Sequence, residues 1–280
     1  MTDRPPFVSF LSDYGLVDEF VGVCHAVMLD VTPDLRIVDI THDIAPFDVR
    51  AGALALVRAV QYLPDGVVLA VVDPGVATER RCIAVEVDGG FLVGPDNGLL
   101  APSVAMLGGP ARIVTLDNPE YQLVAPGPTF AGRDVMAPAA AYLAAGVPID
   151  ALGSPVDAAA LAPGLVPLPQ EGDDGTISGE VLWVDRFGNC QLNVAPEQLS
   201  ARGAVVGDYV GVTVGGADRR AKWVTAFADA KPSELALVVD SYGMCALAFD
   251  QRSAAAELKL RAGTTLTLVA LTEGRAEGRA

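Results

Sequence analysis

The chain is poor in positive charge. Its 280 residues include 19 Lys and Arg against 35 Asp and Glu, which gives a formal net charge of −16. A surface this negative repels phosphate backbones and anionic lipid headgroups, so neither nucleic acid nor a membrane is expected as a partner. A cationic or zwitterionic small molecule remains compatible with that charge.

Histidine and cysteine are also scarce. The chain has two histidines and four widely spaced cysteines without a C-x-x-C pair, so no zinc motif of ordinary spacing is present and no metal is expected. Isolated thiols are typical of a reducing compartment. No apolar run approaches membrane-spanning length, and no basic stretch followed by an apolar core opens the chain. These absences predict a cytoplasmic location.

Familiar nucleotide and hydrolase motifs are missing as well. Neither G-x-G-x-x-G nor G-x-x-x-x-G-K-[ST] occurs, which argues against a dinucleotide fingerprint and a phosphate loop. There is no G-x-S-x-G nucleophile elbow either. A generic dehydrogenase or α/β hydrolase is therefore poorly supported.

The apolar residues that are present, 51% of the chain, suffice for a sizeable core. In the first half, short apolar runs typical of buried parallel strands alternate with stretches of helical spacing. This alternation predicts an α/β domain with a largely parallel sheet flanked by helices. The expected strands are 7–11, 36–40, 67–72 and the hairpin 83–87 with 91–93, and the expected helices are 20–28, 52–62 and 135–145.

A change in composition and hydrophobic pattern divides the chain. Residues 166–175 are rich in Pro, Gly and acidic side chains and read as a linker. We therefore expect an N-terminal α/β domain over 1–165 and a smaller, β-barrel-like C-terminal domain over 176–280. Short alternating strands support the second domain, at 177–184, 209–214, 235–239, 245–249 and 266–271.

Two polar turns follow expected strands. Ser12-Asp13 and Asp73-Pro74-Gly75 lie where parallel strands should end, and ligands of open α/β sheets gather at that edge. Asp13 could accept hydrogen bonds from both hydroxyls of a ribose. Its alternative role is to cap the helix that follows.

Eight segments, in order along nearly the whole chain, resemble the S-adenosyl-L-methionine (SAM) hydroxide adenosyltransferase family, the water-using relative of fluorinase and chlorinase. The segments are F-L-S-D-Y-G (10–15), V-D-I-T-H-D-I-A-P-F-D-V (38–49), V-V-D-P-G-V-A-T-E-R-R (71–81), V-G-P-D-N-G-L-L (93–100), P-T-F-A-G-R-D (128–134), D-R-F-G-N (185–189), F-A-D-A (227–230) and D-S-Y-G (240–243).

The resemblance implies a SAM hydrolase that forms adenosine and L-methionine by an SN2 attack of water or hydroxide on the ribose 5′ carbon. It implies the same two-domain fold and a homotrimer in which each active site lies between the N-terminal domain of one subunit and the C-terminal domain of its neighbour. No metal or organic cofactor is required, because SAM is itself the substrate.

The resemblance also assigns the binding residues. Asp13 would hold the ribose hydroxyls, and Phe47 would pack over the sugar and the reacting carbon. Phe187 and Phe227 would sandwich the adenine, and Asn189 would read its edge through paired donor and acceptor groups. Without the resemblance, all three phenylalanines would be read as ordinary core.

The methionine end is assigned to three further positions. Asp185 matches the carboxylate that holds the methionine ammonium, a charge-assisted contact. Ser241 and Tyr242 fall where the family binds the methionine carboxylate. Halogenating relatives carry arginine at the second of these positions, and a purely structural turn is the alternative for D-S-Y-G.

Asp73 and Arg80 discriminate between water and halide chemistry. The halogenating relatives have tyrosine where this chain has Asp73, and a carboxylate repels a halide but can orient water. Arg80 is expected to keep the carboxylate ionised, since a neighbouring cation favours the charged form. A salt bridge that only braces the D-P-G turn is the structural alternative.

Ala131 is the departure from the family. The water-using enzymes have histidine at this position, completing an Asp-Arg-His catalytic set, and a methyl group cannot transfer a proton. His25 on the first helix and His42 in the T-H-D turn do not replace it in sequence, and His42 is expected to be a structural hydrogen-bonding residue. We expect slowed hydrolysis with substrate binding largely kept.

Two other functions stay open. One is a SAM- or adenosine-binding protein with little catalysis, which Ala131 favours. The other is a 5′-halogenase, which Asp73 disfavours.

Overall fold

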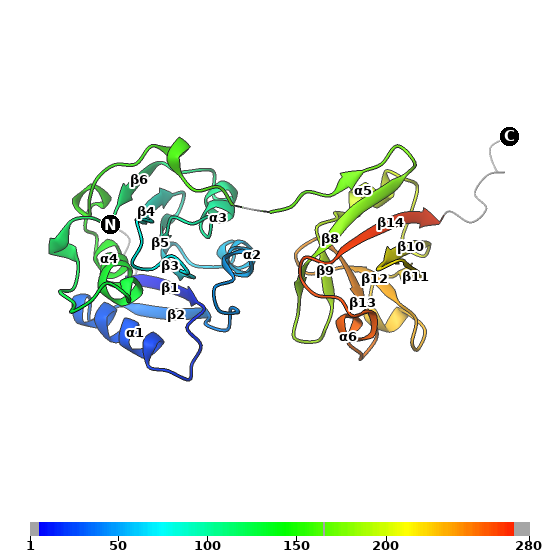
Figure 1. Ribbon diagram of the computed structural model, residues 1–280, viewed down its shortest axis with the longest axis horizontal. Helices are drawn as coiled ribbons and strands as arrows, with labels where there is room; N and C mark the ends of the chain where they lie inside the picture. The colour runs from blue at the N-terminus through cyan, green and yellow to red at the C-terminus, as the bar shows by residue number, and fades with distance from the viewer. Residues whose placement is uncertain (1–5, 165, 272–280) are drawn as a thin grey trace. The chain divides into compact units, whose positions relative to one another are not determined.

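The computed structural model of the chain describes residues 6–164 and 166–271. The chain divides into two compact units, Met1–Val166 and Pro167–Ala280. The first is an α/β unit and the second a β-barrel, as predicted (Figure 1). Within the described residues no helix has both the length and the apolar character needed to cross a membrane.

The first unit is built on a six-stranded sheet with strand order β2-β1-β3-β5-β4-β6. The first four strands in this order run parallel, while β4 and β6 pair antiparallel. The prediction of a largely parallel sheet is confirmed. The bounds are β1 Phe7–Ser12, β2 Arg36–Thr41, β3 Gly66–Val71, β4 Cys82–Val87, β5 Gly90–Pro95 and β6 Arg112–Thr115.

Helices cover both faces of this sheet (Figure 1). Helices α1 (Phe20–Val31) and α4 (Ala137–Ala144) pack together on one face, where they bury alternate residues of β1 and β3. Helices α2 (Val49–Val60) and α3 (Ala101–Met106) pack together on the other face. Because both faces are covered, β3 reads as a continuous apolar run.

Two helices begin earlier than the sequence predicts. Helix α2 starts at Val49, because the side chain of Asp48 accepts a hydrogen bond from the Ala51 amide at 2.9 Å and caps it. The stretch predicted as a helix over 135–145 begins instead with a π-helical turn, Gly132–Met136, that leads into α4. The short 3-10 helices are Pro119–Tyr121, Ile149–Ala151, Ala158–Ala160 and Phe227–Asp229.

The second unit is a closed seven-stranded barrel with strand order β14-β10-β11-β12-β13-β9-β8, which β14 and β8 close by pairing antiparallel. All five predicted strands are present, and β9 and β11 are additional. The bounds are β8 Thr176–Val184, β9 Cys190–Leu192, β10 Tyr209–Val214, β11 Ala217–Trp223, β12 Ala236–Val239, β13 Cys245–Ala248, β14 Thr265–Leu271, with helices α5 Pro196–Ser200 and α6 Ala254–Leu258.

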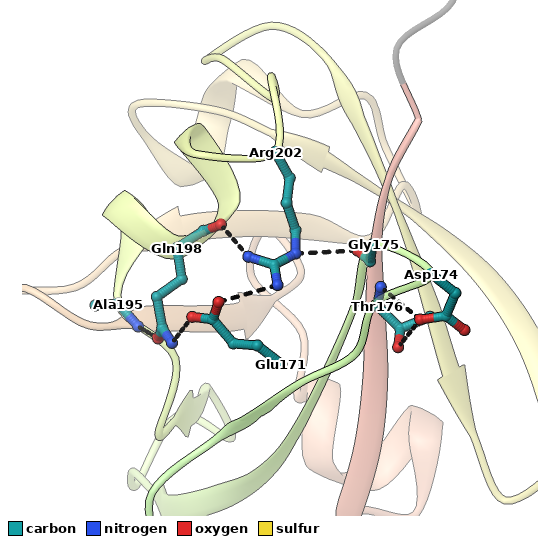
Figure 2. A network of polar contacts seen from close by, with 7 residues as sticks. All are labelled: Glu171, Asp174, Gly175, Thr176, Ala195, Gln198 and Arg202. Carbon is teal, nitrogen blue, oxygen red and sulfur yellow. Dashed lines mark hydrogen bonds and ion pairs between the residues drawn. The ribbon is translucent and has the colours of Figure 1, made fainter.

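Part of the segment read as a linker belongs to the barrel unit. Strand β7 (Gln170–Glu171) pairs with β8, and a network of side chains holds the turn that follows (Figure 2). Arg202 donates to the carbonyls of Gly175 and Gln198 and to the Glu171 carboxylate, each at 3.1 Å. Gln198 also donates to Glu171, at 2.9 Å. Arg202 therefore fastens the start of the barrel to α5.

Replacing Arg202 with Met is expected to lower the free energy of unfolding of the barrel unit by about 1–3 kcal/mol, since two backbone carbonyls lose a charged donor. The Arg202 side chain is only 16% exposed, so its hydrogen bonds are partly shielded from water. Both tryptophans of the chain, Trp183 and Trp223, lie in this unit, so denaturation followed by tryptophan fluorescence reports its unfolding. As a control, Glu171→Gln at a half-exposed position is expected to cost less than about 1 kcal/mol. Equal losses for both variants would contradict this role for Arg202.

Candidate active site

A cavity of about 380 Å³ opens at the carboxyl ends of β1 and β3. The two strands are parallel neighbours, with Ser12 opposite Val71, so the turns that follow them meet at one edge of the sheet. Four of the residues predicted for the site line this cavity, namely Asp13, Phe47, Asp73 and Ala131. The full lining is Asp13, Tyr14, Phe20, Pro46, Phe47, Asp73, Val76, Thr129, Phe130, Ala131 and Gly132.

Asp13 holds Phe47 over the cavity. The Asp13 carboxylate accepts a hydrogen bond from the Phe47 amide at 2.8 Å. Phe47 has a φ of 69°, in the left-handed region that bulky residues rarely adopt, and it is 72% exposed. The core reading of this residue is therefore wrong. An exposed aromatic in a strained conformation is the kind of feature that ligand sites maintain.

The electrostatics of the cavity centre on two carboxylates. Burial raises the pKa of Asp13 above its ordinary value of 3.8, the Phe47 hydrogen bond offsets part of the rise, and the nearby charge of Asp73 adds to it. Two negative groups at one small cavity favour a cationic ligand.

Asp73 forms a buried ion pair with Arg80. The guanidinium Nε donates to Asp73 Oδ1 at 2.7 Å and Nη2 donates to Oδ2, so the contact is bidentate. The side chains are 7% and 13% exposed. Burial by itself lowers the pKa of Arg80, but the hydrogen bonds to Asp73 and the charge of that carboxylate raise it above the ordinary value. Arg80 thus stays charged and fixes both carboxylate oxygens.

Three aromatic rings form a wall of the cavity. Tyr14, Phe20 and Phe130 stack edge to face with centroids 5.2 to 5.7 Å apart. A Cβ at Gly132 would lie 2.0 Å from the Tyr14 hydroxyl, so only glycine admits this packing. Burial raises the pKa of Tyr14 well above 10, which leaves its hydroxyl protonated. Sequence reasoning missed all three rings, although Tyr14 and Phe130 lie inside segments that it singled out.

Ala131 contributes a methyl group where the family resemblance anticipates an imidazole. It is buried at the start of the π-helical turn. Among the described residues that line the cavity, the titratable side chains are Asp13, Tyr14 and Asp73, and neither histidine is one of them. Histidine chemistry is therefore not supplied from elsewhere in the described lining.

A second pocket, of about 450 Å³, lies in the barrel unit. Phe187, Asn189 and Phe227 line it, as the sequence predicts, together with Phe249, Asp250, Gln251, Arg252 and Ser253. Phe187 is 77% exposed and Phe227 is 45% exposed, so both present aromatic faces to solvent. Reading these two rings as core would be wrong.

Asp185 supports this pocket from outside its lining. Its carboxylate accepts hydrogen bonds from the Phe187 amide at 2.9 Å, the Asn189 amide at 2.8 Å and the Asn189 side chain at 2.8 Å. These bonds shape the D-R-F-G-N turn. Asp185 therefore sets the positions of both Phe187 and Asn189.

Ser241 and Tyr242 also lie outside the lining of that pocket. They occupy a turn held by Asp240, whose carboxylate accepts from the amides of Tyr242 at 2.9 Å and Met244 at 3.1 Å. Asp240 further accepts from Gln191 at 2.5 Å, which ties the turn to β9. The turn role that the sequence left open for D-S-Y-G is thus visible in the structure.

The chain thus has two units, an α/β unit whose cavity is lined by carboxylate and aromatic side chains and a barrel whose pocket is lined by exposed aromatic rings. Comparison with known proteins gives the family. The chain belongs to the SAM hydroxide adenosyltransferase family: residues 8–153 match its N-terminal domain and residues 179–267 its C-terminal domain.

Individual relatives are similar over nearly their whole length. The chain is 43% identical to the (R)-S-adenosyl-L-methionine hydrolase of Salinispora arenicola, covering 95% of this chain and 98% of that one. A fluorinase of an Actinoplanes species is more distant, at 28% identity over 94% and 97% of the two chains. An uncharacterised conserved protein of Thermotoga maritima has a crystal structure that matches with a TM-score of 0.87 at 33% identity, over 94% of this chain and 99% of that chain.

Replacing Asp13 with Asn is expected to raise the melting temperature of the first unit at pH 7. The pKa of Asp13 is higher in the folded protein than its ordinary value of 3.8, so ionisation favours the unfolded state and the contribution of Asp13 to stability falls as the pH rises through that interval. Asn keeps an oxygen for the Phe47 amide. Calorimetry should show a gain that shrinks as the pH falls toward 3.8. A gain that is constant, or that grows on acidification, would argue against this, and the exposed Asp43→Asn serves as the control.

Proposed function

We propose that the chain hydrolyses SAM, with water displacing methionine from the ribose 5′ carbon to release adenosine and L-methionine. The Asp73–Arg80 pair is the observation that carries the proposal, because it places a fixed carboxylate, rather than a halide site, in the cavity. The names of relatives support the proposal, since relatives at 39–43% identity over nearly their whole length are called (R)-S-adenosyl-L-methionine hydrolases. The fluorinases are more distant.

In this reaction the main task of the protein is to position the water and the substrate. The sulfonium makes methionine a neutral leaving group, so the electrons of the C5′–S bond pass to sulfur while the water oxygen bonds to C5′. Asp73 accepts a hydrogen bond from the attacking water and holds it opposite the C–S bond. Arg80 keeps the carboxylate in one orientation, and the proton lost from the new C–O group passes to Asp73 or to solvent.

The remaining residues bind the substrate in this proposal. Asp13 accepts hydrogen bonds from the ribose hydroxyls, and Phe47 covers the sugar. Phe187 and Phe227 stack on the adenine, where each base–aromatic stack contributes roughly 1–3 kcal/mol, and Asn189 reads the adenine edge. The methionine ammonium binds Asp185, whose carboxylate has lone pairs that the hydrogen bonds of the turn do not use. The methionine carboxylate binds Ser241 and Tyr242.

The two pockets lie in different units, and we propose that they combine across subunits of a homotrimer. This arrangement would bring the adenine pocket of one barrel to the Asp73 cavity of a neighbouring chain. We further propose that the reaction uses no metal or organic cofactor. All four cysteines are free thiols, which supports the proposed cytoplasmic location.

Replacing Asp73 with Asn is expected to reduce adenosine release at least about 10²-fold, since the water loses an anionic acceptor at the reacting carbon. Calorimetric binding of SAM should change much less. Chromatography of adenosine and methionine measures the rate. Asp96→Asn is the matched control, because it weakens another carboxylate–guanidinium pair, between the buried Asp96 carboxylate and the partly exposed Arg81, outside the cavity lining.

The outcomes separate the candidate functions. An unchanged rate in Asp73→Asn, or an equal loss of rate in Asp96→Asn, would refute the proposed role. Binding of SAM by the unmodified chain without adenosine formation would favour the binding protein, which Ala131 supports. A halogenated nucleoside formed with chloride or fluoride would instead establish a halogenase.

Replacing Ala131 with His is expected to raise the rate of adenosine release, by up to about 10²-fold, because an imidazole in the cavity adds a general acid/base group. The position lines the cavity, so a larger side chain has open space on one side. Ala131→Gln, of similar size but without a titrating group, is the control and should give no increase. Equal rates for Ala131→His and the unmodified chain would show that this position has no catalytic part.

A further inference from the structure

Both histidines of the chain converge on one carboxylate. His25 on α1 places Nε2 at 2.9 Å from Asp39 Oδ1, and His42, just after β2, places Nε2 at 3.1 Å from the same oxygen. A possible ligand atom of each of the three residues lies within 4.8 Å of the other two. Helix α1 and strand β2 lie side by side in the first unit (Figure 1). These are the two histidines of the chain.

His42 is held in the orientation of a metal ligand. Its Nδ1 lies 2.7 Å from the hydroxyl of Ser12, and its ring packs edge-on against Phe10 at 4.7 Å. When Nδ1 carries the proton and donates to Ser12, Nε2 is left with a bare lone pair. Metal-binding histidines are commonly oriented by such a second hydrogen bond.

The Nε2 of His42 is otherwise poorly accommodated. His42 is 5% exposed, and its Nε2 is buried and makes no hydrogen bond to the residues that the structure describes, although it lies 3.1 Å from Asp39 Oδ1. A buried polar atom without a partner destabilises the fold. A bare imidazole lone pair directed at a carboxylate oxygen is also repelled by it. A cation between the two groups would remove both penalties.

We propose that His25, Asp39 and His42 bind a divalent transition metal, with Zn²⁺ as the best fit. Two imidazoles and one carboxylate match the ligand preferences of zinc, while Mg²⁺ and Ca²⁺ prefer oxygen alone. Zinc bonds of about 2.0–2.2 Å require ligand atoms no more than about 4 Å apart. Both histidine–Asp39 distances satisfy this limit, and the ligand atoms of the two histidines lie within 4.8 Å of each other. Asp39 is 42% exposed and His25 28%, so an ion can enter and solvent can fill the fourth position.

The site is separate from the reaction and adjoins its machinery. None of the three ligands lines the catalytic cavity, yet Ser12 precedes Asp13 and the His42 carbonyl accepts a hydrogen bond from Gly15 at 2.8 Å. Metal binding would therefore stabilise the S-D-Y-G turn. No sequence motif indicates such a site, because its ligands come from a helix, a strand and a turn.

The test uses tag-free full-length protein, so that His25 and His42 are the only imidazoles. Calorimetry with Zn²⁺ should show one ion per chain and no comparable binding of Mg²⁺. Tetrahedral Co²⁺ in its place should absorb in the visible, without the near-ultraviolet charge-transfer band that a cysteine ligand would give. His25→Gln, at a partly exposed position, should weaken zinc binding by at least about 10²-fold, and Ser12→Ala by about 10–100-fold.

Asp43→Asn is the matched control, because it removes an exposed acidic charge one residue from His42 and should leave zinc affinity unchanged. Zinc binding that persists in His25→Gln and Asp39→Asn, or that falls equally in Asp43→Asn, would refute the site and indicate general attraction to the acidic surface. Absence of zinc binding to the unmodified chain would also refute it. Adenosine release measured in parallel keeps this result apart from the proposed hydrolysis, which does not depend on the metal.

Discussion

The buried ion pair between Asp73 and Arg80 constrains the rest of the α/β unit. Neither charge could be buried alone without a large cost in desolvation, so each requires the other. Asp73 lies two residues after the end of β3, and Arg80 lies two residues before the start of β4. The pair therefore fixes the connection between these strands and points a carboxylate at the cavity. Since Arg80 engages both oxygens, the carboxylate has a single orientation.

The cavity gains its character from what surrounds that pair. Asp13 follows the neighbouring parallel strand β1, and its raised pKa reflects chiefly its burial, to which the nearby charge of Asp73 adds. Two carboxylates and one guanidinium leave a net negative field in an aromatic enclosure, which is suited to a sulfonium. Phe47 is held in a strained backbone conformation by the Asp13 carboxylate. Asp13 thus contributes to the negative charge of the cavity and also fixes the position of Phe47 over it.

The sequence predicts the architecture where physical periodicity is strong. Strands β1 and β3 and helix α1 follow from apolar patterns, and the strand-end rule locates Asp13 and Asp73. Strand β11 was missed because charged residues such as Arg219 and Arg220 break its pattern, although a barrel strand can turn these side chains to solvent. Tyr14, Phe20 and Phe130 were missed for the opposite reason, since aromatic residues that line a cavity look like core in sequence. The π-helical turn Gly132–Met136 has no characteristic sequence pattern, so the sequence does not predict it.

The alanine at position 131 is compatible with hydrolysis because the attacking water loses its proton late, as the new C–O bond forms. Water that attacks C5′ becomes strongly acidic only as the new C–O bond forms, and the departing thioether needs no proton. In the proposed reaction the acceptor can then be a weak base, such as the Asp73 carboxylate that Arg80 binds. A histidine would assist by accepting the proton earlier in the transition state. The proposed role of the Asp73–Arg80 pair therefore accounts for a slow reaction without that histidine, at a rate limited by how well the pair orients water.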